Sequence, residues 1–276
     1  MSLNRRGLGL LEMLIAISLT AVLALLVWSI LERSAFRLRD RSERIAMEHS
    51  LRVAASVVRS VLEPLGHDST AGADLAMVAP DALIARAVRA SGVLCDATSD
   101  TLHIRDGAPW WTELRAPVPG RDSVLIGTVF GAERWVASAL GAAPHAGSCP
   151  DGTPALLLPV GLAALDLAVI GAGSPIRVFE PMEVRAYSSG GAQWLGMRSI
   201  SSGGSIQPLA GPLLGSGVVF RYFARDGSAE LAAGAVARVA MEIGGITERA
   251  GGVGVARVAQ TRIDSAAGAV LLRNTP

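Results

Sequence analysis

A long apolar block near the N-terminus is the clearest feature of the hydrophobic pattern. Residues 8–31 include one charged side chain, Glu12, and residues 13–31 include no charge, proline or glycine. As a helix, these 24 residues would span about 36 Å, enough to cross the roughly 30 Å hydrocarbon core of a bilayer. Arg5 and Arg6 precede the block, so the positive-inside rule leaves the N-terminus in the cytoplasm and sends the rest of the chain outward.

The helical pattern continues beyond this block, first with a polar surface and then with an amphipathic one. Charged side chains dominate residues 32–48, and opposite charges recur four positions apart, as in Asp40 and Arg44. Apolar residues then recur every three or four positions, which predicts a helix face packed on a core: Met47, Leu51, Ala54, Val58, Val61 and Leu65. Pro64 and Gly66 end this pattern, so the sequence predicts one helix of about 55 residues.

After Gly66 the pattern changes to short segments separated by turn residues, which predicts an antiparallel β domain. Residues 67–82 and 143–154 are expected to be loops, whereas residues 82–90 and 155–170 fit either a helix or a strand. Strands are expected at residues 92–95, 101–105, 123–130, 134–139, 175–187, 193–200, 217–224, 236–243, 254–263 and 269–273.

Composition limits the classes of function to consider. The chain has 276 residues and a net charge of +1, so there is no electrostatic case for nucleic acid as its main partner. Residues 32–276 are enough for one large or two small domains. Abundant glycine, 31 residues, is typical of a β domain with many turns.

The chain has two cysteines, Cys95 and Cys149. A pair of cysteines on the outer side of a membrane anchor indicates a disulfide. This bond would close a loop of 55 residues and contribute about 4 kcal/mol in the chain-entropy model. Two free buried thiols or a metal-binding pair are the alternatives.

Glu12 is unusual because it lies inside the apolar block. A carboxylate in a membrane helix costs about 2.5–3.5 kcal/mol near the centre and less near the edge, so it normally has a partner. If the chain were cut after Gly7, a new α-ammonium group at Leu8 would lie one helical turn before Glu12. The same group on a neighbouring chain could pair with Glu12 and form an ion pair between two subunits.

These N-terminal residues resemble the class III signal of type IV pilins and type II secretion pseudopilins. The resemblance rests on the basic leader, on Gly7, Leu8 and Glu12, and on the string Leu-Leu-Glu-Met-Leu-Ile-Ala at residues 10–16. It implies cleavage between Gly7 and Leu8, N-methylation of Leu8, and a role for Glu12 in ordering subunits within a filament. Leu8 stands where the family usually has Phe or Met, and Gly9 where it usually has Thr or Ser.

The C-terminal part extends the resemblance to particular subunits. Residues 213–227 are similar to a late strand of larger minor subunits, in which an apolar-Phe-x-Tyr run leads into an Asp-Gly turn. Together with the chain length, this is most like the J-type pseudopilin and the W-type minor pilin. The resemblance implies an α+β fold with a long helix packed on an antiparallel β-sheet head. The expected parts are a leader (1–7), a transmembrane or filament-core helix (8–31), its amphipathic continuation (32–65) and a periplasmic head (66–276).

The function implied is assembly rather than catalysis. The resemblance implies a single-pass inner-membrane precursor whose partners are prepilin peptidase, other pilin-like subunits through the N-terminal helix, the inner-membrane assembly platform and, before assembly, the lipid bilayer. The bulky head suggests a place at or near a filament tip, where a surface-binding or carbohydrate-binding adhesin is a compatible role. A plain single-span anchor carrying a periplasmic enzyme or ligand-binding module is the alternative from another class.

Motifs for catalysis or cofactors are weak. Residues 169–174 imitate the opening of a dinucleotide-binding fingerprint, but Ile176 occupies the third glycine position and a strand pattern follows. No Gly-x-Ser-x-Gly elbow precedes a helix, and the four histidines are scattered singly. Asp96, Asp100 and Asp106 lack the ligand order of a calcium loop. We therefore expect no enzyme activity, cofactor or metal.

Overall fold

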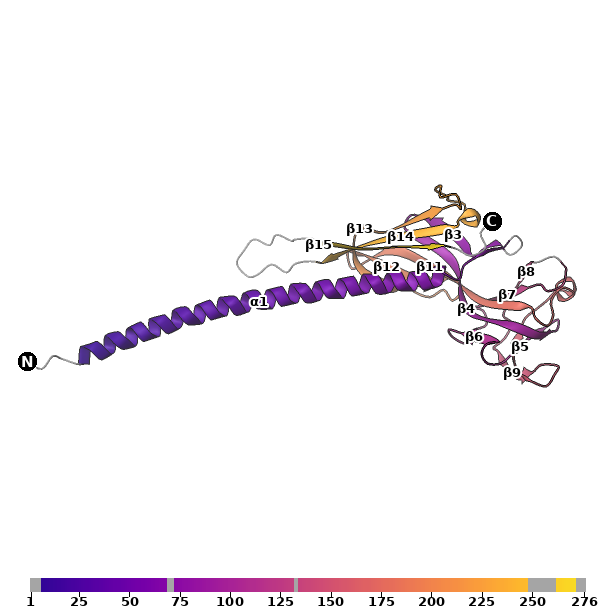
Figure 1. Ribbon diagram of the computed structural model, residues 1–276, viewed down its shortest axis with the longest axis horizontal. Helices are drawn as coiled ribbons and strands as arrows, with labels where there is room; N and C mark the ends of the chain where they lie inside the picture. The colour runs from indigo at the N-terminus through magenta and orange to yellow at the C-terminus, as the bar shows by residue number, and fades with distance from the viewer. Residues whose placement is uncertain (1–5, 69–71, 132–133, 248–261, 272–276) are drawn as a thin grey trace, which may run out of the picture.

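The molecule has an α+β fold in which one long helix carries a β-rich head. The computed structural model describes residues 6–68, 72–131, 134–247 and 262–271. The head packs on the C-terminal half of helix α1 (Arg6–Leu62), and the N-terminal half projects away from it (Figure 1). The expected fold class, a long helix packed on an antiparallel sheet, is confirmed.

Helix α1 has 57 residues, close to the predicted length, and ends just before Pro64. Its buried side chains are those of the predicted stripe up to Val61 together with Leu62, and Leu65, also buried, follows the end of the helix. Gly245 approaches the helix closely: a Cβ there would lie 2.5 Å from Met47 Sδ and 3.3 Å from Leu51 Cδ1, so the Met47 side chain would have to shift. The amphipathic half of the helix therefore forms one side of the hydrophobic core that it shares with the head.

The head consists of short and long strands with two single-turn helical segments. Its strands are β1 (His67–Asp68), β2 (Gly72–Ala73), β3 (Leu75–Ala79), β4 (Ala82–Ala97), β5 (Thr101–Arg105), β6 (Trp111–Glu113), β7 (Ser123–Gly127), β8 (Trp135–Ala139), β9 (His145–Ser148), β10 (Pro154–Pro159), β11 (Pro175–Ser189), β12 (Ala192–Ser199), β13 (Gln207–Phe223), β14 (Arg238–Thr247) and β15 (Arg262–Leu271). The helical segments are α2 (Ala164–Leu167) and the 3₁₀ turn η1 (Ala233–Ala235).

Within the described residues, thirteen strands join into one sheet, and β1 and β2 form a separate pair. The main path runs β15-β14-β13-β12-β11-β4-β5-β10-β9; β3 and β6 also pair with β4, while β7 pairs with β11 and β8. The pairings of these strands are antiparallel. Strands β4 and β11 run through the whole head, and their register shifts between Val178 and Phe179.

This shift separates two hydrophobic cores, which define two lobes. The helix-side lobe packs α1 against β3, β12, β13, β14, the first part of β4 and the last part of β11, with Leu51, Leu83 and Val184 fully or almost fully buried. The distal lobe encloses a second core between the remaining parts of β4 and β11 and strands β5 to β10, including Leu102 and Ile126. It lies beyond the C-terminal end of α1 (Figure 1).

Several predicted strands are confirmed and several predicted loops are wrong. Strand β5 has the predicted bounds, β7 and β8 form the predicted pair, and β11 and β12 form the predicted hairpin. Of the two segments that fitted either a helix or a strand, residues 82–90 are part of strand β4, and residues 155–170 contain most of strand β10 and the short helix α2. The two predicted loops contain β3 and β9, and β13 begins ten residues before its predicted start at residue 217. Of the predicted strand at 254–263, residues 254–261 lie outside the described part of the chain.

The wrong predictions have physical reasons. Strand β9 consists of four exposed small or polar residues, so it shows no hydrophobic alternation. The first half of β13 contains Gly211 and Pro212, residues that usually interrupt a strand, and its register shifts between Leu213 and Val218. Both segments become strands only by pairing with neighbouring strands, and the local sequence does not show that pairing.

Candidate functional site

The N-terminal start of α1 holds the three residues of the expected processing and assembly motif. Gly7 and Leu8 lie in the first turn of the helix, and Glu12 lies one turn later with its side chain exposed. Four residues of helix correspond to about 6 Å along the axis. Within the described residues, no ion pair involves Glu12. The arrangement leaves its carboxylate open to a partner outside this copy of the chain.

The apolar half of α1 exposes its large apolar side chains. The large apolar side chains from Leu11 to Leu31 are more than half exposed, because the head does not reach them. The hydroxyls of Ser18, Thr20 and Ser29 donate to backbone carbonyls three or four residues earlier, so these polar groups are satisfied within the helix. By length and composition this helix can cross a membrane, which fits a single-pass anchor.

An exposed apolar seam continues from this half along the back of the head-bearing half. We call it the outer seam; it consists of Leu31, Ala35, Leu38, Ser42, Ile45, His49 and Val53. Its members are three or four residues apart, and all are exposed, Leu38 at 65 % and Ile45 at 67 %. At 3.6 residues per turn, the outer seam lies roughly opposite the buried stripe that contains Leu51 and Val58.

Charged side chains flank the outer seam and are partly paired along the helix. Arg39 Nε lies 3.2 Å from Glu43 Oε1, and Arg44 Nε lies 2.8 Å from Glu48 Oε1. Both are i, i+4 pairs, which stabilise a helix by about 0.2–0.5 kcal/mol each. The outer seam is therefore a narrow stripe, apolar or small except at His49 and bordered by charge, the pattern that packs against another helix.

In the head, buried charges lie where the two lobes meet. Glu180 on β11 is 0 % exposed and accepts hydrogen bonds from Arg89 Nε at 2.8 Å, Arg115 Nη2 at 2.9 Å and Arg121 Nε. Arg115 also binds the buried Asp122 carboxylate through two bonds of 2.7 Å each. We call these five residues the junction cluster. It ties β4 and β11 to the loop that carries Arg115, Arg121 and Asp122.

The junction cluster keeps Glu180 ionised. Burial raises the pKa of this carboxyl, but hydrogen bonds from Arg121, Ser199 and Arg115 and the charge of Arg89 outweigh it and lower the pKa to about 2. Sequence reasoning missed this cluster because its members lie up to 91 residues apart. The one available signal was an acid in the middle of the apolar run of β11.

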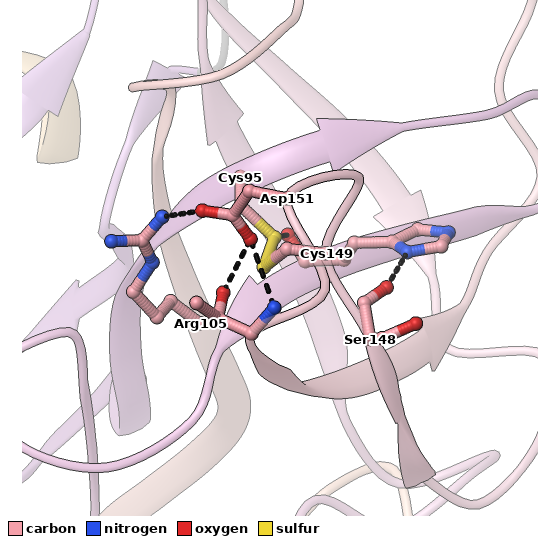
Figure 2. The surroundings of a disulfide bond; sticks show 7 residues. Cys95, Arg105, Ser148, Cys149 and Asp151 are labelled. Atoms are coloured by element: carbon pink, nitrogen blue, oxygen red, sulfur yellow. Dashed lines mark hydrogen bonds and ion pairs between the residues drawn. A yellow bond between two sulfur atoms is a disulfide. The ribbon is translucent and has the colours of Figure 1, made fainter.

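The disulfide expected between Cys95 and Cys149 is present, and it joins the end of β4 to the loop after β9 (Figure 2). The same loop is held by further contacts. Asp151 Oδ1 accepts from the Thr153 backbone N–H at 3.0 Å and from Thr153 Oγ1 at 2.6 Å, and a ring nitrogen of His103 lies 3.0 Å from the Ser148 carbonyl oxygen. The bond therefore fixes the outer edge of the distal lobe.

The weak cofactor and metal motifs form no site of that kind. Residues 171–174 make a turn that hydrogen-bonds to Leu94, and the strand β11 follows directly. Asp100 accepts from Thr98 in a surface turn, and this hydrogen bond lowers the pKa of Asp100. In the described part of the chain, no group of three or more His, Cys, Asp or Glu side chains is placed to hold a metal ion.

Comparison with known proteins identifies the N-terminal segment. Residues 2–28 match the model of the prokaryotic N-terminal methylation motif. No curated protein and no solved structure matches the chain. The matched segment contains Gly7, Leu8 and Glu12 and most of the apolar block. The chain thus carries a prokaryotic N-terminal methylation motif, and this motif supports its placement in the type IV pilin and pseudopilin family.

Proposed function

We propose that this chain is a minor subunit of a type II secretion pseudopilus or a type IV pilus, processed by prepilin peptidase and assembled at or near the filament tip. The observation that carries the proposal is the matched motif at residues 2–28 in front of an exposed apolar helix. Proteins with this motif are in general not enzymes, and the function proposed is mechanical assembly.

Processing would occur at the start of α1. Hydrolysis of the Gly7–Leu8 peptide bond adds one water, which leaves a carboxylate on the leader and an α-ammonium group on Leu8. Methylation of this nitrogen keeps its positive charge. The ammonium group of one subunit and Glu12 of a neighbour then form an ion pair, whose attraction is strong because the surroundings are apolar. This pairing would set the position of one subunit against the next.

The apolar half of α1 supports the proposed move from membrane to filament. Before assembly, lipid covers its exposed side chains, and the cytoplasmic N-terminus and periplasmic head follow from the orientation expected for the arginines at positions 5 and 6. In a filament, helices of other subunits take the place of lipid. The outer seam extends the same apolar surface to Val53, so contact between subunit helices would continue beside the head.

The size and shape of the head support a minor rather than a repeating subunit. The head has two lobes, and the distal lobe extends beyond the end of α1 (Figure 1). Such a subunit would crowd a closely packed shaft, but it fits a tip, which has no subunit above it. No proline lies between Leu8 and Glu63, whereas shaft pilins often have one in the membrane half. The J-type pseudopilin and the W-type minor pilin are the subunits we consider nearest.

Photo-crosslinking in the host cell tests this function. A photoreactive amino acid replaces residue 38 or 45 in the outer seam, or residue 37, which is exposed on another side of α1, as a matched control. We expect crosslinks from positions 38 and 45 to other pilin-like subunits, and their loss in a Glu12→Leu variant. Absence of such crosslinks, with the protein stable in the membrane, would favour a plain anchored module instead.

A further inference from the structure

The distal lobe contains a cavity that the proposed assembly function does not use. We call it the tip cavity; its volume is about 380 Å³, within the range of about 300–1,000 Å³ that is typical of small-molecule pockets. Both cysteines of the disulfide belong to its lining. Figure 2 shows the surroundings of this disulfide, which lies in the distal lobe. Its lining comes from the end of β4, the end of β5 and three loops, and it includes Cys95, Arg105, Trp110, Cys149 and Asp151.

The polar groups of the tip cavity are held in place before any ligand arrives. Arg105 Nη2 donates to Asp151 Oδ2 at 2.7 Å, and the Arg105 guanidinium lies over the Trp110 ring, 5.5 Å from its centroid (Figure 2 shows the first contact). The loop carrying Asp151 is fixed by Thr153 and by the bond between Cys95 and Cys149. A preorganised site of this kind loses little conformational entropy on binding.

The chemistry of the lining selects a class of ligand. Trp110 is 43 % exposed, so part of its aromatic surface stays open to a ligand even though Arg105 lies over the ring. Arg105 and Asp151 are the charged residues of the lining, and their charges cancel, so neither an anion nor a cation is favoured overall. A guanidinium only donates hydrogen bonds and a carboxylate only accepts them, whereas a hydroxyl does both. Adjacent hydroxyls on a ring with an apolar face would satisfy all three side chains.

We propose that the tip cavity binds a neutral hexopyranose ring, with the apolar face of the sugar on Trp110 and its hydroxyls on Arg105 and Asp151. A phosphorylated ligand would place negative charge against Asp151. A purely apolar ligand would gain no hydrogen bond from the two charged groups at the rim. This site is independent of cleavage at Gly7, because every residue that forms it belongs to the distal lobe.

Fluorine NMR of the full-length chain tests the proposal. The protein is labelled with 5-fluorotryptophan and held in phosphatidylcholine nanodiscs, because detergents with sugar head groups would compete. Its five tryptophans give separate signals, and Trp110→Phe identifies the one from the cavity. The probes are the methyl glycosides of glucose, galactose and mannose and the N-acetylglucosamine trisaccharide, each to about 10 mM, ten-fold above a 1 mM Kd.

We expect at least one sugar to move the Trp110 signal saturably while the other four signals stay fixed. Arg105→Lys should weaken this binding by about ten-fold or more, because lysine lacks the planar donor fork. Trp135→Phe is the matched control: Trp135 also lies under an arginine, Arg177, at 4.8 Å, but outside the cavity lining, so binding should be unchanged. A Trp110 signal unmoved by all four sugars would overturn the proposal.

Discussion

The apolar half of α1 and the head contain similar residues but place them in opposite environments. Where the head packs on α1, apolar side chains such as Leu51 and Leu83 are buried, and the buried acid Glu180 in the head is surrounded by arginines. In the apolar half, the leucines are exposed, and Glu12 has no ion pair among the described residues. The described part of the head buries its apolar side chains within one chain, whereas those of the apolar half are left exposed for a bilayer or other subunits to cover. Changes in these two regions should therefore affect different measurements.

The largest effect on the head should come from its buried charge. Glu180→Gln removes the negative charge that pairs with Arg89, Arg115 and Arg121, so it should lower the free energy of unfolding by about 3–5 kcal/mol. Urea unfolding of the full chain in detergent, followed by tryptophan fluorescence, measures the change. The matched control is Glu242→Gln, whose exposed pair with Arg221 at 3.7 Å should contribute less than about 1 kcal/mol. Equal effects of the two substitutions would show that the junction cluster does not stabilise the head.

Truncation in the two halves of α1 should give a similarly clear contrast. Leu51→Ala leaves a cavity between the helix and the sheet and should lower the free energy of unfolding of the head by about 2–5 kcal/mol. Leu23→Ala, in the exposed half, should change it by less than about 0.5 kcal/mol. The same urea experiment measures both. A large effect of Leu23→Ala would mean that the apolar half also stabilises the head, so that the two regions are not independent.

Acid should weaken the head through Glu180. The pKa of this carboxyl is about 2 in the folded protein, against 4.5 as its ordinary value, so the unfolded chain binds the proton more readily. The stabilisation is therefore complete above pH 4.5 and is lost as the pH falls toward 2. The unfolding equilibrium constant should rise by up to about ten-fold per pH unit in this range. In Glu180→Gln this part of the pH dependence should disappear; its persistence would assign the effect to other carboxyls.

The smallest effect on the head should come from the outer seam. Leu38→Asp and Ile45→Asp change exposed side chains, so each should alter the free energy of unfolding by less than about 0.5 kcal/mol. Each should nevertheless reduce co-purification with other pilin-like subunits, because a charge would be buried between helices. Arg37→Asp, on another side of the helix, is the control. Normal co-purification of both seam variants would remove the seam from the proposed interface.

The parts of the molecule that the sequence predicts best are those with local signals. The helix could be predicted to its end just before Pro64, because the charges, the periodicity and the helix breaker that define it are all local in the sequence. The processing motif is equally local, since Gly7, Leu8 and Glu12 lie within six positions. The disulfide between Cys95 and Cys149 needed only the count of cysteines and the expected compartment.

The parts that could not be predicted depend on residues far apart in the chain. The sheet divides into two lobes where β4 and β11 change neighbours. No single residue in either strand predicts this division. The junction cluster and the tip cavity each join residues from separate loops and strands. The resemblance to pilins could be inferred from residues close together in the sequence, whereas the cavity can be recognised only in the folded head.

The most direct test of the central claim is the N-terminal mass of the protein, expressed with and without a prepilin peptidase. We predict a mature form that begins at N-methylated Leu8 and appears only with the peptidase. A Gly7→Ala variant should keep its original N-terminus even when the enzyme is present. An intact N-terminus in the unaltered protein with active peptidase, or a cut beyond residue 31, would contradict the account.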